Sequence, residues 1–377
     1  MSQAWSGLGR RPTSLIDAAE QALATVDVPE GLDAMSLLSW AAGAEQLPSQ
    51  TARNDVFGQP PLILYREEDF VVQALTWMDG TTAIHQHGFA GAFRVLQGSS
   101  LHVEHRFAAG ERLADIRLAV GELSIRRAEV LRPGATRRIE PGDVFIHALF
   151  HLEQPTVTAV VRNTTCGLPN PQYSYRPPGL AWDGLWDDRT WSKRLQSLDT
   201  VSRLDPTAAR AAVADLVTRL PVWEAFNLVD HWALRQGWDA TTADLADRLA
   251  ARVEPLGEVL APALEHDARV RRILYRRGML KARHQRVLLA LLANLPDEAS
   301  ITAILHDLFP GQVAGDLLVD WVEELSAPAL RGISGLSLSP DRLEALRAGP
   351  LDGREAEILA EIRAAWGEPV TAARLFS

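Results

Sequence analysis

The stretch that decides the fold of this chain is Gly80-Thr-Thr-Ala-Ile-His85-Gln-His87-Gly-Phe-Ala-Gly-Ala-Phe-Arg-Val-Leu-Gln-Gly98. Residues two apart on a β-strand point to the same side of a sheet, so the imidazoles of His85 and His87 can bind one metal ion from the same direction. Imidazole is a common ligand of divalent transition metals. The stretch therefore predicts a strand that carries two ligands of a metal site.

Histidines are concentrated around this stretch. A third ligand has to come from another strand, and Glu140-Pro-Gly-Asp-Val-Phe-Ile-His147-Ala-Leu-Phe-His151 supplies two candidates after a Pro-Gly-Asp turn. Three imidazoles leave open positions on the ion, as in catalytic rather than structural sites. His102 and His105 alternate along one strand, so at most one of them faces a barrel interior. Six of the ten histidines of the chain lie in this region, at His85, His87, His102, His105, His147 and His151.

Short runs with a period of two surround the histidine pair, and turn residues such as Pro133-Gly134 and Pro141-Gly142 separate them. This pattern is typical of an antiparallel sandwich or barrel. The predicted strands are Leu62–Arg66, Phe70–Trp77, Ala92–Leu96, Leu101–Phe107, Ile116–Val120, Glu122–Val130, Arg137–Ile139, Val144–Ala148 and Thr156–Arg162.

Helical patterns flank the β-rich region on both sides. Apolar residues recur at helical spacing in the first fifty-odd residues, and again after Asp205-Pro206 to the end of the chain. Prolines and three tryptophans crowd the connection between the strands and the second helical region. We therefore predict an α+β chain with four parts: an N-terminal helical segment (1–58), an antiparallel β-barrel (59–165), a Pro/Trp-rich linker (166–204) and a separate all-helical C-terminal domain (205–377).

Composition narrows the possible partners. The chain has 377 residues, of which 47% are hydrophobic and 23% charged, as expected for packed globular domains. Its net charge of -10 repels phosphate backbones and anionic membranes, so we expect neither nucleic acid nor a membrane as a partner. The single cysteine, Cys166, excludes an internal disulfide. With no signal peptide or transmembrane run recognisable, the expected location is the cytoplasm.

The histidine stretch resembles the first motif of the cupin superfamily, which has a Gly, a His-x-His pair, usually a Glu, and a closing Gly. Gly80, His85, His87 and Gly98 fit it, with one residue fewer between Gly80 and His85. The Glu position falls at Gly91 or Ala92, so the chain is closer to the three-histidine cupins. The resemblance implies a jelly-roll barrel over about residues 60–165. The third ligand that it implies is His151, with His147 as the alternative.

Within the cupins, the chain looks most like the thiol dioxygenases, the family of cysteine dioxygenase. Their Trp, Ser-Ser-Ile-His-x-His and Leu-x-Gly elements are matched by Trp77, Thr82-Ala-Ile-His85-Gln-His87 and Leu96-Gln-Gly98. That family also has a Tyr-x-Arg whose Arg binds the substrate carboxylate, and Tyr65-Arg66 stands in the corresponding strand without the intervening residue. The match ends there. Where some members have a crosslinking cysteine this chain has Ala92, and their Ser-x-His-x-Tyr motif is not recognisable in Val157-Thr-Ala-Val-Val-Arg162.

The resemblance implies a mononuclear non-haem iron(II) dioxygenase with His85, His87 and His151 as ligands, another divalent metal being possible. It further implies that Tyr65 and Arg66 contact a small thiol or amino-acid-like substrate, which O2 oxidises. As alternatives, Arg66 is a rim charge, or Arg94 takes its place. The runner-up functions are a cupin metalloenzyme of specialised metabolism and a non-catalytic ligand sensor. The helical domain is expected to cover the barrel mouth, form a homodimer or recruit a partner protein.

Overall fold

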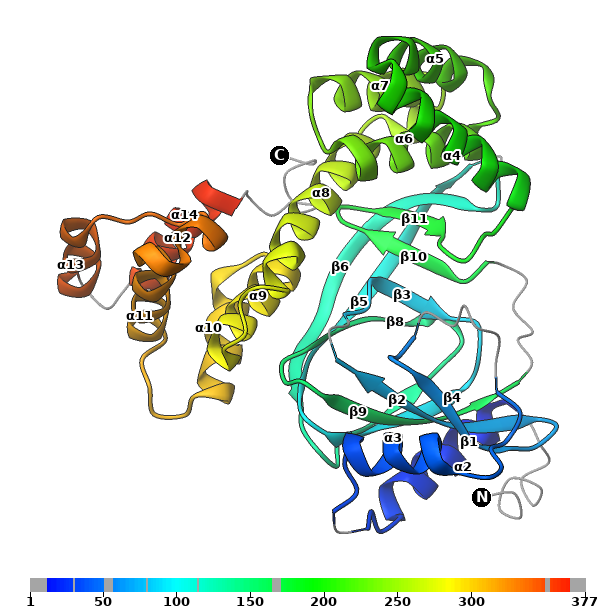
Figure 1. Cartoon of the computed structure of the whole chain (residues 1–377), viewed down its shortest axis with the longest axis vertical. Helices are drawn as coiled ribbons and strands as arrows, with labels where there is room; N and C mark the ends of the chain where they lie inside the picture. Colours follow the sequence, from blue (N-terminus) through cyan, green and yellow to red (C-terminus); the bar gives the residue numbers. More distant parts are fainter. Residues whose placement is uncertain are drawn as a thin grey trace. The chain divides into compact units, whose positions relative to one another are not determined.

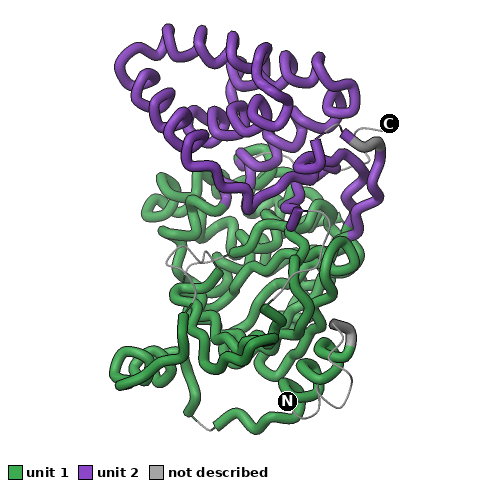
Figure 2. Tube along the Cα trace, turned by 90° about the vertical axis from the view of Figure 1, so that its right-hand side faces the viewer, with its two compact units in different colours: residues 1–105, 125–169, 274–365 green, residues 106–124, 170–273, 366–377 purple. Residues whose placement is uncertain are grey.

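The structure is a computed structural model in which the chain forms two compact units (Figure 2). Unit 1 comprises residues 1–105, 125–169 and 274–365, and unit 2 comprises residues 106–124, 170–273 and 366–377. The residues that the structure describes are 12–29, 31–50, 57–78, 81–113, 115–164, 171–349 and 353–366.

The described β-strands form two sheets (Figure 1). Eight of the strand pairs have a defined residue register, and all eight are antiparallel. One sheet lies in unit 1 and has the order β1-β2-β9-β4-β7, and the other closes in the order β10-β11-β6-β5-β8-β3. This confirms the predicted antiparallel β-barrel architecture. The strands are β1 (Pro61–Arg66), β2 (Phe70–Trp77), β3 (Ile84–His87), β4 (Gly91–Gln97), β5 (Ser100–Arg112), β6 (Leu118–Leu131), β7 (Thr136–Ile139), β8 (Gly142–His151), β9 (Thr156–Asn163), β10 (Tyr173–Arg176) and β11 (Leu180–Asp183).

Strand β6 is longer than the sequence predicted. The runs Ile116–Val120 and Glu122–Val130 were expected as two strands, but β6 runs without a break from Leu118 to Leu131, and its residues are assigned to both units. The glycine has a structural role within it: a Cβ at Gly121 would lie 2.3 Å from the carbonyl oxygen of Ala108. Gly121 therefore allows close approach of two backbones and does not mark a turn.

The two sheets enclose an apolar core in unit 1. Side chains alternate along a strand, so one set of each sheet faces inward. The buried inward-facing residues that pack together are Phe93, Val95, Leu131, Ile139, Phe145, Leu149 and Val160. Strands of both sheets contribute to this cluster, which defines the barrel interior.

Two N-terminal helices cover the other face of the five-stranded sheet, as the helical pattern predicted. Helix α2 (Pro12–Thr25) packs on Ala92 and Val161, and α3 (Ala34–Gly43) packs on Ala74. Arg94, an alternative substrate-binding residue in the sequence, is on this outer face. Its guanidinium donates to the carbonyl oxygens of Leu23, at 2.5 Å, and Val26, at 3.0 Å. Arg94 therefore caps the C-terminal end of α2.

The C-terminal region is largely helical, as expected. Helices α4 to α7 belong to unit 2 and α9 to α13 to unit 1. The residues of α8 are divided between the units, and α14 belongs to unit 1 except for its last residue, Trp366. None of the described helices is long and apolar enough to span a membrane. The helices are α4 (Arg189–Leu204), α5 (Pro206–Arg219), α6 (Val222–Gln236), α7 (Ala240–Ala250), the short 3-10 helix η1 (Glu254–Leu256), α8 (Leu260–Arg277), α9 (Arg283–Asn294), α10 (Glu298–Leu308), α11 (Ala314–Ser326), α12 (Pro328–Ser334), α13 (Pro340–Ala348) and α14 (Arg354–Trp366).

The segment expected as a linker, 166–204, contains regular structure in its described part, namely β10, β11 and α4. Its tryptophans explain this. Trp191 is buried in the core of unit 2 together with Trp223, and Trp182 and Trp186 pack against the same cluster. Burial of these large aromatic side chains stabilises a folded segment where the prolines suggested a linker.

Candidate metal centre

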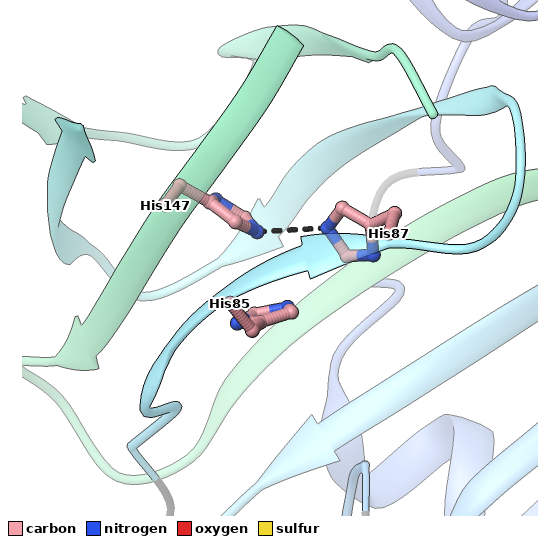
Figure 3. Close-up of side chains that lie close together, drawn as sticks. All are labelled: His85, His87 and His147. Atoms are coloured by element: carbon pink, nitrogen blue, oxygen red, sulfur yellow. Dashed lines mark hydrogen bonds between the residues drawn. The ribbon is translucent and has the colours of Figure 1, made fainter. Parts of the chain in front are cut away.

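Three histidines from two paired strands meet in the interior of unit 1 (Figure 3). Strands β3 and β8 pair so that His85 lies opposite His147, and His87 follows two residues later. Nε2 of His87 is 2.9 Å from Nε2 of His147. One ring nitrogen of each of the three lies within 4.8 Å of those of the other two. The exposed fractions are only 5% for His85, 8% for His87 and 2% for His147.

The geometry of this group suits a divalent ion. Metal–imidazole bonds are about 2.0–2.1 Å long, so two nitrogens bound at a right angle lie about 2.9 Å apart. That is the separation between the facing nitrogens of His87 and His147. The three imidazoles form a nitrogen donor set of the kind that transition metals prefer. The group can therefore hold a metal ion.

The protonation states agree with metal binding. Burial lowers the pKa of His85 to about 4, although a hydrogen bond to the carbonyl oxygen of Ala83 partly offsets it. Burial also lowers the pKa values of His87 and His147 well below the usual value. All three rings are therefore neutral near pH 7, as a metal ligand has to be. Nδ1 of His85 donates to Ala83 at 2.8 Å, which leaves its Nε2 with the lone pair.

His151, the third ligand favoured by the sequence, lies outside this group. Its ring stacks on Trp77 with centroids 4.5 Å apart, and its Nδ1 is 2.9 Å from Oγ of Ser100. It sits four residues beyond His147 on β8, which is about 13 Å along a strand. Both side chains face inward, but β3 pairs with β8 at His147. The structure thus brings the alternative candidate, His147, to the pair.

Tyr65 and Arg66 also lie apart from the histidines. Both are exposed and stand on β1, an edge strand of the five-stranded sheet. The hydroxyl of Tyr65 donates to Glu67 at 2.6 Å, and Nε of Arg66 donates to the carbonyl oxygen of Ser49 at 3.1 Å. These local partners belong to the rim of the sheet. The structure therefore does not bring the two predicted substrate contacts to the candidate metal centre.

A different arginine lies near the histidines. It was not predicted from the sequence as a site residue. The guanidinium of Arg162, on β9, is 5.0 Å from the ring centroid of Phe89, and that ring is 4.7 Å from the ring of His87. Its Nε donates to Gln73 at 2.8 Å. The charge of Arg162 contributes to the lowered pKa of His87, after burial and His85. The sequence does hold one indication of its direction: Arg162 lies two residues after Val160, which faces the barrel core, and residues two apart on a strand face the same side.

Aromatic side chains surround the histidines. Phe145 lies 4.5 Å from His147 between ring centroids, and Phe93 lies 6.0 Å from it. Both phenylalanines are buried in the barrel core. His102 is fully buried as well, with its Nε2 3.0 Å from Nδ1 of His147. Among the described residues, phenylalanine rings thus pack directly against the imidazoles, and a low-polarity environment strengthens electrostatic interactions within the site.

Two residues that the sequence analysis used fall outside the described part of the chain. Gly80 opens the histidine motif, and Cys166 is the single cysteine. The predictions that rest on them stay predictions.

Comparisons with known proteins find similarity only among solved structures. No family model matches, and no curated protein matches. A cupin superfamily protein from Desulfitobacterium hafniense is 12% identical, and the match covers 37% of this chain and 97% of that chain with a TM-score of 0.21. Hydroquinone 1,2-dioxygenase from a Sphingomonas species is 14% identical, with coverages of 30% and 70% and a TM-score of 0.21. A recombinant oxalate oxidase in complex with glycolate is 21% identical, with coverages of 25% and 41% and a TM-score of 0.18. Similarities this low and this partial do not indicate which activity, if any, the chain shares with these proteins.

Proposed function

We propose that this chain is a mononuclear metalloenzyme whose ion is bound by His85, His87 and His147, and that it uses O2 to oxidise a small anionic substrate, a thiol or an amino-acid-like molecule. The observation that carries the proposal is the buried group of three neutral imidazoles, with two facing nitrogens 2.9 Å apart. Burying three polar rings side by side is costly, and a bound ion offsets that cost.

The donor set is compatible with a redox-active ion. Bound by these three neutral ligands, an ion such as Fe²⁺ would keep its full charge and would supply a centre for the reaction of an anionic substrate with O2. The surrounding residues exclude water and orient the ligands. Phe93 and Phe145 exclude water beside His147. The carbonyl oxygen of Ala83 holds the ring of His85 in one orientation.

Arg162 supports an anionic substrate. Its charge contributes to the lowered pKa of His87, and Phe89 contacts both its guanidinium and that imidazole. A guanidinium presents several donors in a fixed plane and binds a carboxylate through two hydrogen bonds. In this proposal Arg162 therefore takes the role that the sequence resemblance assigned to Arg66.

The first experiment measures metal and oxygen together. We expect the purified protein to contain about one equivalent of iron or another divalent metal, and His85→Ala to contain almost none, because each ligand contributes several kcal/mol of binding. The Fe²⁺-loaded protein should consume O2 in the presence of a small thiol or amino acid, measured with an oxygen electrode. A substrate panel of cysteine, cysteamine and 3-mercaptopropionate begins the search.

The outcomes separate the alternatives. A protein without stoichiometric metal that His85→Ala does not alter would contradict every enzymatic proposal and favour a ligand sensor. Bound metal with no O2 uptake for any thiol would contradict the thiol substrate. Uptake with a different small acid would instead assign the protein to another oxygenase reaction on the same ion.

A second experiment compares two arginines with the substrate that supports O2 uptake. Arg162 is half-buried, and a bound substrate would bury it further. We expect Arg162→Gln to raise the KM of that substrate about 30- to 1,000-fold, since losing one partner of a charge pair buried by binding costs about 2–4 kcal/mol. Arg162→Lys should fall between, because it keeps the charge and loses the planar fork. Arg66→Gln is the matched control on the exposed rim and should change KM less than about twofold. Equal effects of the two glutamine variants would contradict the role of Arg162.

A further inference from the structure

A chain of hydrogen bonds leads from His147 towards the surface of unit 1. Nδ1 of His147 is 3.0 Å from Nε2 of His102, and Nδ1 of His102 is 3.1 Å from Oε1 of Glu129. His102 is completely buried, whereas the side chain of Glu129 is 22% exposed. Strand β5 carries His102 next to β8, with Glu104 opposite His147. Two imidazoles in series thus connect a carboxylate near the surface to the candidate metal centre.

The carboxylate at the outer end is held in its ionised form. Arg137 donates to both oxygens of Glu129, through Nε at 2.9 Å and through Nη2, and Nη2 of Arg127 is 3.1 Å from Oε1. Burial alone would raise the pKa of Glu129, but the hydrogen bond with His102 and the contact with Arg137 outweigh it and lower the pKa to about 2. An ionised carboxylate only accepts hydrogen bonds.

Counting protons along this hydrogen-bonded path then determines the tautomer of each imidazole ring. A neutral imidazole has one donor nitrogen and one acceptor nitrogen. An ion bound by Nε2 of His147 needs the lone pair there, so the proton of His147 is on Nδ1 and is donated to Nε2 of His102. The proton of His102 is then on Nδ1, facing the carboxylate of Glu129. Every donor along this path meets an acceptor.

We propose that Glu129 and His102 are positioning residues that hold His147 in the tautomer and orientation required of a metal ligand. The inference rests on the proposed metal centre and adds two residues that are not ligands. We call the hydrogen-bonded path from Glu129 through His102 to His147 the relay. Hydrogen-bonded partners of ligating histidines fix ring orientation and raise ligand basicity, and their loss typically lowers metal affinity about 10- to 100-fold.

The same residues are less suited to a second metal site. One oxygen or nitrogen each of His102, Glu104 and Glu129 lies within 4.8 Å of the others. Both carboxylates are already paired with arginine, however: Glu104 accepts from Arg127 at 2.5 Å, and Glu129 accepts from Arg137. Both ring nitrogens of His102 are engaged as well. A cation here would have to displace these partners, so the relay is the better account.

The test uses Zn²⁺ as a probe and the full chain. Affinity is measured by competition with a chelator for the wild type, Glu129→Ala, Glu129→Gln and Glu104→Gln. We expect Glu129→Ala to bind Zn²⁺ about 10- to 100-fold more weakly, and Glu129→Gln to recover part of this loss, because its amide oxygen still accepts from His102. Glu104→Gln removes a carboxylate that pairs with Arg127 but is not a member of the hydrogen-bonded path from Glu129 to His147, so it should stay within about twofold of the wild type.

A second readout needs no variant. Ring-labelled nitrogen-15 histidine NMR of the Zn²⁺-loaded wild type should show His102 and His147 both protonated at Nδ1. A spectrum with His102 doubly protonated, or with His147 protonated at Nε2, would overturn the inference, as would equal affinities of Glu129→Ala and Glu104→Gln. Failure of the metal centre itself would look different, since the wild type would then bind no Zn²⁺.

Discussion

Replacing His147 with alanine is expected to abolish stoichiometric metal binding, while replacing His151 with phenylalanine leaves it intact. His147 shares the barrel interior with His85 and His87, and its Nε2 faces Nε2 of His87 at 2.9 Å. Four-ligand zinc sites are worth about 10–16 kcal/mol, or roughly 2.5–4 kcal/mol per ligand. Loss of His147 should therefore weaken metal affinity on the order of 10²–10³-fold.

His151 is the matched comparison because it is equally buried and lies on the same strand. Phenylalanine keeps the stacking on Trp77 and removes only the hydrogen bond with Ser100. Metal content by elemental analysis and affinity by chelator competition should stay within about threefold of the wild type, with circular dichroism confirming the fold of both variants. Retention of metal by His147→Ala together with its loss in His151→Phe would show that the ligand is the one the sequence favoured.

Much of the fold could be predicted because local patterns determine it. The period-two runs around Phe70–Trp77 and Thr156–Arg162 became β2 and β9 almost residue for residue. Turn residues between the runs indicated antiparallel pairing, and the N-terminal helices followed from their apolar spacing. The segment 166–204 differed because its prolines suggested a linker. Trp191 is buried in a cluster that includes Trp223, a residue far along the chain.

The candidate site was predictable only in part because ligand choice depends on strand register. His147 and His151 have the same parity on β8, so alternation cannot distinguish them, and only the pairing of His85 with His147 does so. The same limit applies to Arg162. Its inward direction follows from alternation with Val160, but its approach to His87 through Phe89 depends on how the two sheets face each other.

Gly91 lies where the chain tolerates no side chain. Strand β4 pairs with β7 on one side and with β9 on the other, and Gly91 lies opposite Arg162 of β9. A Cβ at this position would be 2.0 Å from the carbonyl oxygen of Val161 and 3.0 Å from Cα of Arg162. Both obstacles are backbone atoms, so no rotamer change can relieve the contact. The absence of a side chain at Gly91 therefore permits the approach of β9 that places Arg162.

Gly91→Ala is consequently expected to destabilise the protein by about 3 kcal/mol or more, at the upper end of overpacking substitutions. The variant should also bind an anionic substrate more weakly, because moving β9 moves Arg162. Urea unfolding followed by circular dichroism measures the first effect.

Gly43→Ala, at the last residue of α3, is the control, because a Cβ there would meet no described atom within 4 Å. It should change stability by less than about 1 kcal/mol, in the stabilising direction, since alanine favours a helix over glycine. Equal stability of the two variants would mean that β4 and β9 can separate without cost, and the close approach at Gly91 would then not be what positions Arg162.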